Sequence, residues 1–493
     1  MGLCMGLALS VPSICAVLGP IAGGLLIHLL TCTPYLRVRV LQLGCFLCGF
    51  LAGSLFWIAQ GIYRPPVNSA WSAGLVFGVL LACQLLIYLL CFTATSMALN
   101  RKPAQAAPSS TVWRTATTLA VTFSAAEILR SIGPLALPWG FWGYGAIDNP
   151  LLNGFYPIAG SYVVTFMLWM LSALLLLWWQ FLYNHVRHRC HASAAPWLLT
   201  LTLLSAAALA HSTDWTHETG AQLKIRLIHT QWPKEEKYRT YNQASSLAML
   251  EAAPFTTRAE LTVFPELFLT ERISSIPAEI REQIAHSTKE QGTALLFGAV
   301  GMTHEPGAPE TSLGRQNTLV LLNEQGLAQT YIKRLLLPFT EYLPTESWLQ
   351  WIWPHLYHYP LADLVPGPMQ QPTLQVRNVH LGPLICSELA SPVLSALQGA
   401  TADMVISPSS DSWIPSSLYL LQAHHLARVR AAELQKPLAR ANNVGVSAFI
   451  DHRGKVLASL SGEAGSGQWT MPARAGRTPY VHIVKWFAAL SGN

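Results

Sequence analysis

Charged residues are scarce in this chain. Lys, Arg, Asp and Glu make up 11% of its 493 residues, whereas 51% are hydrophobic. Charged residues are near a quarter of a typical soluble protein, so this composition excludes an ordinary soluble fold for the whole chain. The net charge of +6 is not evidence for nucleic-acid binding, because residues 1–220 alone hold nine basic and four acidic side chains and so carry five of the surplus charges. Glycine-rich phosphate loops are absent as well.

The scarcity of charge is concentrated in long apolar stretches. Stretches of about 20 apolar residues can cross a bilayer as helices, and they occur at 39–60, 70–98, 112–130, 157–183 and 195–211. Residues 1–31 are almost wholly apolar but are interrupted by Pro12 and Pro20, so they could form one span or two. This block lacks a basic segment at its start, and a cleaved signal peptide is not expected. Residues 1–212 are therefore predicted to be a helical membrane domain of about six to seven spans.

The basic residues of the loops predict the orientation. If the loop after residue 31 is cytoplasmic, seven Lys and Arg residues of this domain lie inside, and only Arg64 and Arg130 lie outside. Such a bias is the usual sign of the cytoplasmic side. The chain then leaves the membrane near residue 212 on the outer face. The polar remainder is predicted to be extracytoplasmic, which in a Gram-negative cell means the periplasm.

The pattern changes at Gln222 to short strands alternating with helices. Residues 222–475 are therefore predicted to be an α/β layered domain. Strands are expected at 224–229, 260–264, 294–300, 317–322, 327–334, 379–385, 403–407, 445–450 and 455–460, and helices at 278–291 and 416–434. Residues 478–493 form a short apolar tail, which is at most a truncated membrane helix.

Cysteine is almost absent from the second domain. Cys386 is the only cysteine after residue 190, so this domain cannot be held by disulfides within it. A free cysteine is commonly a small buried apolar residue, but Cys386 ends an apolar strand and is followed by small and acidic residues. Its setting therefore also suits a nucleophile.

Glu266, Lys333 and Cys386 each stand at the carboxyl end of a predicted strand. Apolar neighbours predict that Glu266 and Lys333 are partly buried, where a charge needs a partner. Taken singly, a carboxylate that caps a turn and a lysine on a hairpin are simpler interpretations. Together, the carboxylate can take the thiol proton, the thiolate can attack a carbonyl and the ammonium can hold the oxyanion. The set predicts covalent catalysis.

The context of the three residues is also that of a known family. Glu266 follows Phe-Pro, Lys333 precedes an apolar stretch with Pro338-Phe339, and Glu388 lies two residues after Cys386. These motifs resemble the nitrilase (carbon–nitrogen hydrolase) superfamily. The stretches 138–144, 337–344 and 427–437, followed by Arg440 and Asn443, extend the resemblance to its membrane-bound branch, the apolipoprotein N-acyltransferases.

This resemblance implies an α-β-β-α sandwich outside the membrane domain. It implies that Glu266 is the base, Lys333 the oxyanion stabiliser and Cys386 the nucleophile, with Glu341 and Glu388 as supporting active-site residues. The implied reaction moves an acyl chain from a phospholipid, through a Cys386 thioester, to the α-amino group of the diacylglyceryl-cysteine of an apolipoprotein. No cofactor and no metal are implied, and the implied location is the bacterial inner membrane.

The sequence departs from the family in two motifs and in its tail. Ser387 stands where the family has an aromatic residue, and Ser410 stands where it has Asn before Asp411. Substrate preference and anchoring of the tail are therefore left open. Two other interpretations also remain: a membrane-tethered amidase, in which water resolves the thioester, and a non-catalytic transfer or assembly component.

Aromatic residues predict two places for lipid access. Trp348, Trp351 and Trp353 are expected to form an arm at the membrane interface that acts as a lid, because indole rings settle there. Trp139 and Trp142, in a predicted outer loop, could line a lipid entry. The adjacent His424 and His425 are not predicted to bind a metal, since neighbouring helical positions point about 100° apart.

Overall fold

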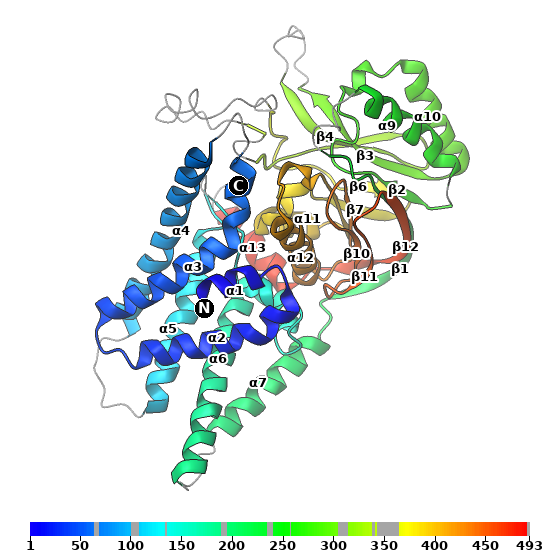
Figure 1. Ribbon diagram of the computed structural model, residues 1–493. Helices are drawn as coiled ribbons and strands as arrows, with labels where there is room; N and C mark the ends of the chain where they lie inside the picture. Colours follow the sequence, from blue (N-terminus) through cyan, green and yellow to red (C-terminus); the bar gives the residue numbers. More distant parts are fainter. Residues whose placement is uncertain are drawn as a thin grey trace. The chain divides into compact units, whose positions relative to one another are not determined.

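The computed structural model describes residues 1–63, 69–99, 108–133, 136–188, 195–233, 240–256, 258–303, 314–337, 341–342 and 364–490. These residues divide into two compact units (Figure 1). The first comprises residues 1–62 and 70–214, and the second comprises residues 63–69 and those from 215 onward.

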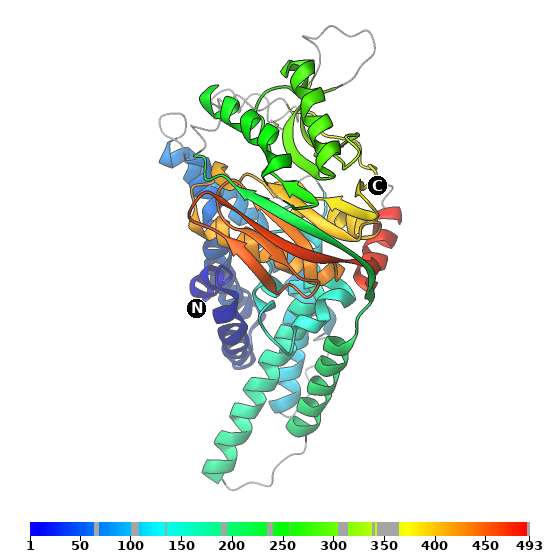
Figure 2. The same cartoon turned by 90° about the vertical axis from the view of Figure 1, so that its right-hand side faces the viewer.

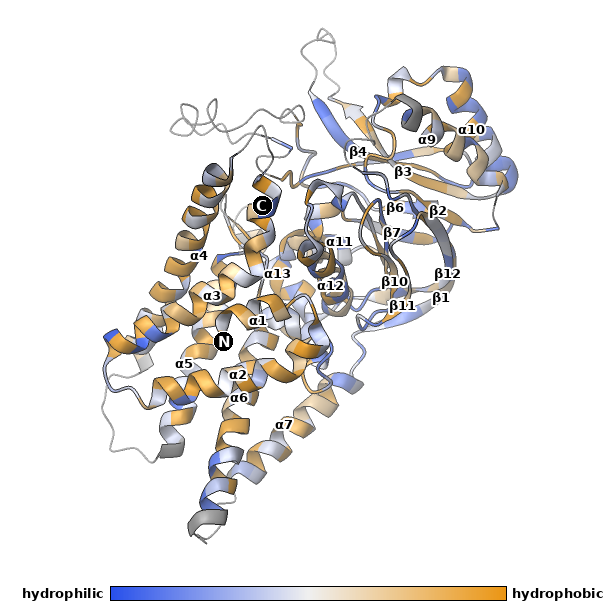
Figure 3. Ribbon diagram, in the orientation of Figure 1, coloured by the Kyte–Doolittle hydropathy of each residue, from blue (hydrophilic) through white to orange (hydrophobic). Residues whose placement is uncertain are grey.

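The first unit is helical. It contains α1 (Gly2–Ala8), α2 (Pro12–Thr31), α3 (Leu36–Ile62), α4 (Ala70–Leu99), α5 (Pro108–Leu129), η1 (Trp142–Ala146), η2 (Asn153–Phe155), α6 (Tyr156–His188) and α7 (Ala195–Ser212). Four described helices are long and apolar enough to cross a membrane, namely Pro12–Thr31, Leu36–Ile62, Ala70–Ala98 and Asn153–His185. Hydrophobic residues predominate along these helices (Figure 3). The count of six to seven spans stays a prediction, since α5 is not among the four and the apolar stretch of α7 is shorter.

The first apolar block folds as two helices. Val11 adopts a non-helical conformation and Pro12 occupies the first turn of α2, where its missing N–H costs nothing. Seven residues of α1 rise only about 10 Å, far less than a hydrocarbon core of about 30 Å. In this block only α2 has a spanning length. Glycine lets α1 pack very closely on α3, because a Cβ on Gly6 would lie 2.2 Å from the carbonyl oxygen of Phe50.

The second unit contains two six-stranded sheets (Figure 2). The first sheet has the order β12-β1-β2-β3-β4-β5, and the second has the order β11-β10-β9-β8-β7-β6. The strands are β1 (Thr216–His229), β2 (Leu261–Val263), β3 (Ala294–Met302), β4 (Arg315–Leu322), β5 (Ala328–Ile332), β6 (Leu374–Val376), β7 (Val379–Pro383), β8 (Met404–Ser409), β9 (Leu438–Asn442), β10 (Ser447–Ile450), β11 (Val456–Leu460) and β12 (Gly465–Gly476). Strands β1, β2 and β3 are parallel, as are β7, β8 and β9.

The apolar faces of the two sheets share one core. Leu227, Val263 and Leu296 of the first sheet pack in the same buried cluster as Leu381 and Ile406 of the second. A second cluster joins the other face of the first sheet to Leu250 of α9 (Thr240–Ala252) and Ile284 of α10 (Ala278–Gln291). With α11 (Pro392–Gly399) and α12 (Ser417–Leu434) packed on the second sheet, the order of layers is α-β-β-α. The predicted sandwich is confirmed.

Short 3-10 turns complete the second unit, namely η3 (Ala253–Phe255), η4 (Ile273–Ser275), η7 (Cys386–Ala390) and η8 (Asp411–Trp413). The predicted apolar tail folds as α13 (Pro479–Leu490), a helix of 12 residues. It packs against α11, and the hydroxyl of Tyr480 donates to the carbonyl of Pro392 at 3.2 Å. Its other side exposes Ile483, Trp486 and Phe487.

Candidate active site

Glu266, Lys333 and Cys386 lie at one edge of the sandwich. Glu266 follows β2 by three residues, Lys333 directly follows β5, and Cys386 follows β7 by three residues. β5 runs parallel to β2, because it is separated from β3 by two antiparallel steps. The carboxyl ends of these strands therefore meet at the same edge. The sequence placed the three residues at strand ends, and the fold brings those ends together.

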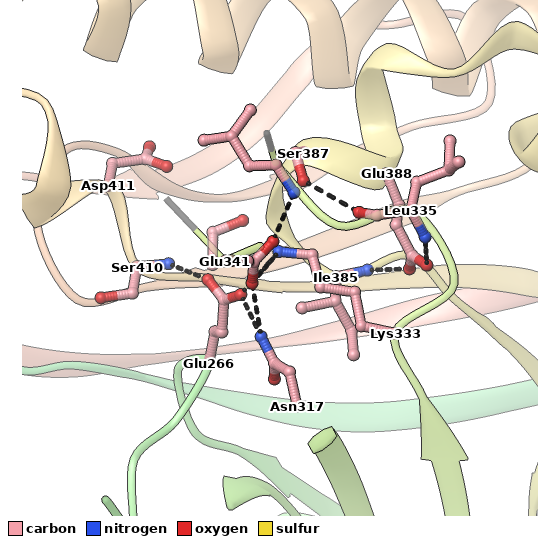
Figure 4. Close-up of polar contacts among 12 residues, drawn as sticks. Glu266, Asn317, Lys333, Leu335, Glu341, Ile385, Ser387, Glu388, Ser410 and Asp411 are labelled. Atoms are coloured by element: carbon pink, nitrogen blue, oxygen red, sulfur yellow. Dashed lines mark hydrogen bonds and ion pairs between the residues drawn. The ribbon is translucent and has the colours of Figure 1, made fainter. Parts of the chain in front are cut away.

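Lys333 is held between two carboxylates. Its Nζ lies 3.1 Å from Oε1 of Glu266 and 2.8 Å from Oε1 of Glu341 (Figure 4). The Asn317 amide donates to the same two oxygens, at 2.8 Å and 3.1 Å respectively. The backbone N–H of Ser410 donates to Oε2 of Glu266 at 3.0 Å. Glu266 is thus a carboxylate with three donors, buried to 3% exposure.

The backbone of Cys386 adopts a positive φ of 48°, in the left-handed region that a residue with a side chain rarely occupies. The carboxylate of Glu388 stabilises this turn through hydrogen bonds. Its Oε2 accepts from the N–H of Ile385 at 2.8 Å and from the hydroxyl of Tyr331 at 2.9 Å. Its Oε1 accepts from the N–H of Arg334. One carboxylate therefore ties the turn of the nucleophile to the strand end that carries Lys333.

The charges of the site control the state of the thiol. Burial, together with the neighbouring Glu266 carboxylate, raises the pKa of Cys386 well above its usual value, while the Lys333 ammonium acts in the opposite direction. For Lys333, burial lowers the pKa, but Glu266 and Glu341 outweigh it and the pKa is raised well above its usual value. The resting site therefore combines a neutral thiol with a permanent ammonium. Glu266 is the carboxylate that the predicted strand ends bring near this thiol.

A small pocket, with a cavity volume of about 30 Å³, opens onto these groups. Glu266, Lys333, Glu341 and Cys386 all line it, together with Ser387, Ser410 and Asp411. The rest of its wall is formed by Leu267, Leu337, Leu364, Trp413, Ile414 and Tyr419. The lining of this pocket therefore combines ionisable side chains with apolar ones, as is common for small-molecule sites.

The sequence interpretation assigned no role to Asn317, and it noted Asp411 and Arg440 only within motifs. Asp411 is buried and accepts from Nη2 of Arg440 at 2.7 Å and from Nδ2 of Asn442 at 2.6 Å. Burial raises the pKa of Asp411, and the Arg440 guanidinium opposes that rise. The pair holds η8, and therefore the Ser410 N–H, against Glu266. The sequence signal that could have indicated a role for Asp411 was the segment 410–413, because it departs from the family pattern.

The predicted lipid-access residues have different outcomes. Trp348, Trp351 and Trp353 lie outside the described residues. Trp139 and Trp142 are buried in the helical unit, with 8% and 2% of their surface exposed. The Trp142 ring stacks on Trp169 with ring centroids 5.2 Å apart, and the backbone N–H of Trp142 donates to Oε1 of Glu127 at 2.7 Å. The lining of a lipid entry by Trp139 and Trp142 stays a prediction, and in the structure aromatic packing and the Glu127 carboxylate hold this segment inside the helical unit.

Among the residues that the structure describes, no group of three or more His, Cys, Asp and Glu side chains could hold a metal ion. His424 and His425 lie on α12 with ring centroids 5.4 Å apart. Burial of His424 lowers its pKa to about 3, which keeps its ring neutral at ordinary pH.

Comparisons with known proteins agree with this geometry. The sequence model of carbon-nitrogen hydrolases matches residues 207–471, more than half of the chain. The chain therefore belongs to the carbon–nitrogen hydrolase family. A second model, the apolipoprotein N-acyltransferase N-terminal domain, matches residues 1–174. The resemblance seen in the sequence is confirmed. The helices of spanning length make this chain a membrane protein of the carbon–nitrogen hydrolase family.

Similar proteins cover most of the chain. An apolipoprotein N-acyltransferase of Pseudomonas syringae is 27% identical over 90% of this chain and 85% of its own length. That of Azotobacter vinelandii is 28% identical over 90% of this chain and 82% of its own length. Among solved structures, Nit3 of Saccharomyces cerevisiae, a member of branch 10 of the nitrilase superfamily, covers 56% of this chain and 96% of its own, with 18% identity and a TM-score of 0.39. An amidase from Nesterenkonia sp. covers 57% of this chain and 98% of its own, with 21% identity and a TM-score of 0.36.

Proposed function

We propose that this protein transfers an acyl chain from a phospholipid to the α-amino group of the N-terminal diacylglyceryl-cysteine of apolipoproteins. One observation carries the proposal: the Glu266–Lys333–Cys386 pocket belongs to a chain whose first 174 residues match the N-terminal domain of apolipoprotein N-acyltransferases. The names of the similar proteins from Pseudomonas and Azotobacter supply the reaction. Helices of spanning length place the chain where both lipid substrates reside.

The geometry supports a reaction in two steps. Glu266 takes the proton of the Cys386 thiol, and the thiolate attacks the ester carbonyl of the phospholipid. The Lys333 ammonium stabilises the oxyanion of the tetrahedral intermediate. When the intermediate collapses, the lysophospholipid oxygen leaves with the proton from Glu266, and the acyl chain remains on Cys386 as a thioester.

The second step reverses the proton path. The amine of the lipoprotein attacks the thioester carbonyl and loses a proton to Glu266. Collapse of this intermediate forms the amide and expels the Cys386 thiolate, which recovers the proton. Glu266 therefore serves as base and acid in turn, and Glu341 holds Lys333 in place at 2.8 Å throughout. Glu388 supports the turn of Cys386.

The positive-inside bias supports a location in the inner membrane with the second unit in the periplasm, where lipoprotein amino groups are accessible. Seven of nine Lys and Arg residues before residue 221 fall on one predicted side of the membrane. Attaching a membrane-impermeant label to intact cells that produce a Lys455→Cys variant in the described β-hairpin would test this location. Labelling at position 455 without lysis is expected, and labelling only after lysis would overturn it.

The decisive experiment uses the full chain in phospholipid nanodiscs with an isotopically labelled acyl chain and a diacylglyceryl-cysteine peptide. Intact mass spectrometry should show one acyl chain on the protein before the peptide is added and an acylated peptide afterwards. Cys386→Ala should abolish both products, whereas Cys45→Ala, in the helical unit, should leave them unchanged.

The same samples separate the proposed transfer from hydrolysis. Release of free labelled fatty acid, with no acylated peptide, would show that water resolves the thioester and that the protein is an amidase-like hydrolase. Absence of any adduct on folded protein would point to a non-catalytic component.

A further inference from the structure

Asn317 is a buried amide that touches both carboxylates of the site. It lies on β4 with none of its surface exposed. Its Nδ2 is 2.8 Å from Oε1 of Glu266 and 3.1 Å from Oε1 of Glu341. Lys333 contacts the same two oxygens from its Nζ. An ammonium and an amide nitrogen therefore bridge one pair of carboxylate oxygens (Figure 4).

The neighbours of the amide determine its orientation. The structure turns the NH2 group of Asn317 toward both carboxylates, so that one nitrogen with two N–H bonds can donate to each, and the amide oxygen points away from them. Within the described part of the chain, this oxygen, Oδ1, is buried and has no hydrogen-bond partner. A buried acceptor without a partner lowers the free energy of unfolding. The side chain of Asn317 therefore donates to both carboxylates although its unpartnered oxygen lowers the stability of the fold.

Two buried carboxylates that share their contacts repel each other. One ammonium neutralises only one of them, and such a pair ordinarily keeps a single proton between its members at neutral pH. A shared proton would disable the base. A second donor with two N–H groups, one to each oxygen, favours the form in which both carboxylates are ionised.

We propose that Asn317 is a positioning residue that separates the roles of the two carboxylates. It keeps the carboxylate of Glu341 against the Lys333 ammonium and leaves the carboxylate of Glu266 to exchange protons with Cys386. The other ionisable groups that face Glu266 are Asp411, which is paired with Arg440, and Tyr419. The inference rests on the proposed function only for the attack of the Cys386 thiolate.

The test is the pH dependence of Cys386 alkylation in Asn317→Leu, which keeps the volume and removes the donors. The full chain in nanodiscs is treated with iodoacetamide, and the adduct is followed on the Cys386 peptide by mass spectrometry. Because the freed carboxylates would then share a proton, the acid limb of the profile should move up by about one pH unit, which is a loss of roughly tenfold on that limb. Adding Glu341→Gln to Asn317→Leu removes the like charge and should move the limb back.

Thr318→Val is the matched control. Thr318 is the next residue of β4, is buried to 4% exposure, and its hydroxyl oxygen likewise has no hydrogen-bond partner among the described residues. This variant should keep the wild-type profile. If Asn317→Leu does not fold, Asn317→Ser replaces it with the same expected shift.

An unchanged profile in a folded Asn317 variant would overturn the proposal, as would an equal loss of rate at every pH, which a merely structural role produces. Alkylation needs no lipid, so a parallel assay of phospholipid-dependent acylation keeps the two hypotheses apart. If the Asn317 variant shows the expected shift in its alkylation profile while the wild-type protein transfers no acyl chain, the proposed function is refuted and the role of Asn317 is not.

Discussion

Gly298 on β3 lies against the backbone of Glu266, the proposed base, and Gly298→Ala should displace this residue. A Cβ at this position would lie 2.2 Å from the backbone nitrogen of Leu267 and 2.9 Å from the Cα of Glu266. Ordinary contact begins at 3.4 Å, so the shortfall, 3.4 Å less 2.2 Å, is 1.2 Å. β3 cannot yield easily, since Gly298 pairs with Leu319 of β4 and its carbonyl accepts from the N–H of Leu269 at 2.9 Å. The segment that carries Glu266 must therefore move.

The size of this movement sets the expected effect. A shift of 1.2 Å would break the contacts of Glu266 with Lys333 and Ser410, now 3.1 Å and 3.0 Å long. A misplacement of about 1 Å can cost roughly a hundredfold in rate. Overpacking of this kind lowers the free energy of unfolding by about 1–3 kcal/mol. Gly298→Ala should thus remain folded but lose most of its acyl transfer.

The assay measures acylation of Cys386 by labelled phospholipid, together with the melting temperature. Gly301→Ala, on the same strand, is the matched control, because its Cβ would meet side-chain atoms of Thr318, Oγ1 at 2.4 Å and Cβ at 3.3 Å, instead of the backbone that carries Glu266. Gly465→Ala has open space and should behave as wild type. A folded Gly298→Ala protein with wild-type acylation would refute the view that Glu266 must stay within these contacts to act as the base.

Three further predictions concern the charged and ionisable groups of the second unit. Lys333→Met should move the pH of half-maximal Cys386 alkylation upward, because this ammonium is the charge that lowers the pKa of the thiol. Glu388→Gln should lower the free energy of unfolding by about 2–4 kcal/mol, measured by denaturant unfolding. The substitution removes the charge that strengthens these hydrogen bonds, and it replaces one acceptor oxygen with an NH2 group that cannot accept from a backbone N–H such as that of Ile385. His424, with a pKa lowered from 6.5 to about 3, remains neutral when folded but binds a proton when unfolded. Stability should therefore fall as the pH drops below 6.5, by up to about 2 kcal/mol at pH 5, and His424→Gln should flatten this dependence in melting experiments.

Each of these has a control in the same unit. Lys455→Met should not change the alkylation profile, and an identical shift there would mean that Lys333 acts only through net charge. Tyr331→Phe removes one donor to Glu388 and should lower the free energy of unfolding by about 1 kcal/mol. A larger loss of stability than in Glu388→Gln would contradict the view that the Glu388 carboxylate holds these contacts together. The control for His424→Gln is the same substitution at His286, whose side chain is 69% exposed.

Local pattern predicted much of the second unit. The helix expected at 278–291 is α10 with the same bounds, and the strands expected at 317–322, 327–334, 445–450 and 455–460 form the antiparallel pairs β4–β5 and β10–β11. Clear turn residues, at 323–326 and 451–454, separate the two strands of each pair. The sequence interpretation did not predict β6, β9, β12, α9 or α11. β9 is buried at all five positions, so it has no alternation to detect.

Tertiary packing decided the positions that local pattern could not. An apolar loop with two tryptophans suits a membrane interface by composition, yet Trp142 is packed against Phe50, Phe123 and Trp169. The first apolar block likewise left one span or two open. The close approach of α1 to α3 through Gly6 depends on a contact with residues more than 40 positions away.

The sequence by itself determined which groups could react: a carboxylate, an ammonium and a thiol at three predicted strand ends. It also determined that the chain, with 51% hydrophobic residues, contains membrane-spanning segments. Only the tertiary structure decided how those groups are tuned. Asn317 reaches Glu266 across 51 positions, and the Ser410 N–H reaches it across 144. Residue type and strand period are local properties that a sequence displays directly. Hydrogen bonds between distant segments depend on how sheets pair and pack, and so they become visible only when the chain is folded.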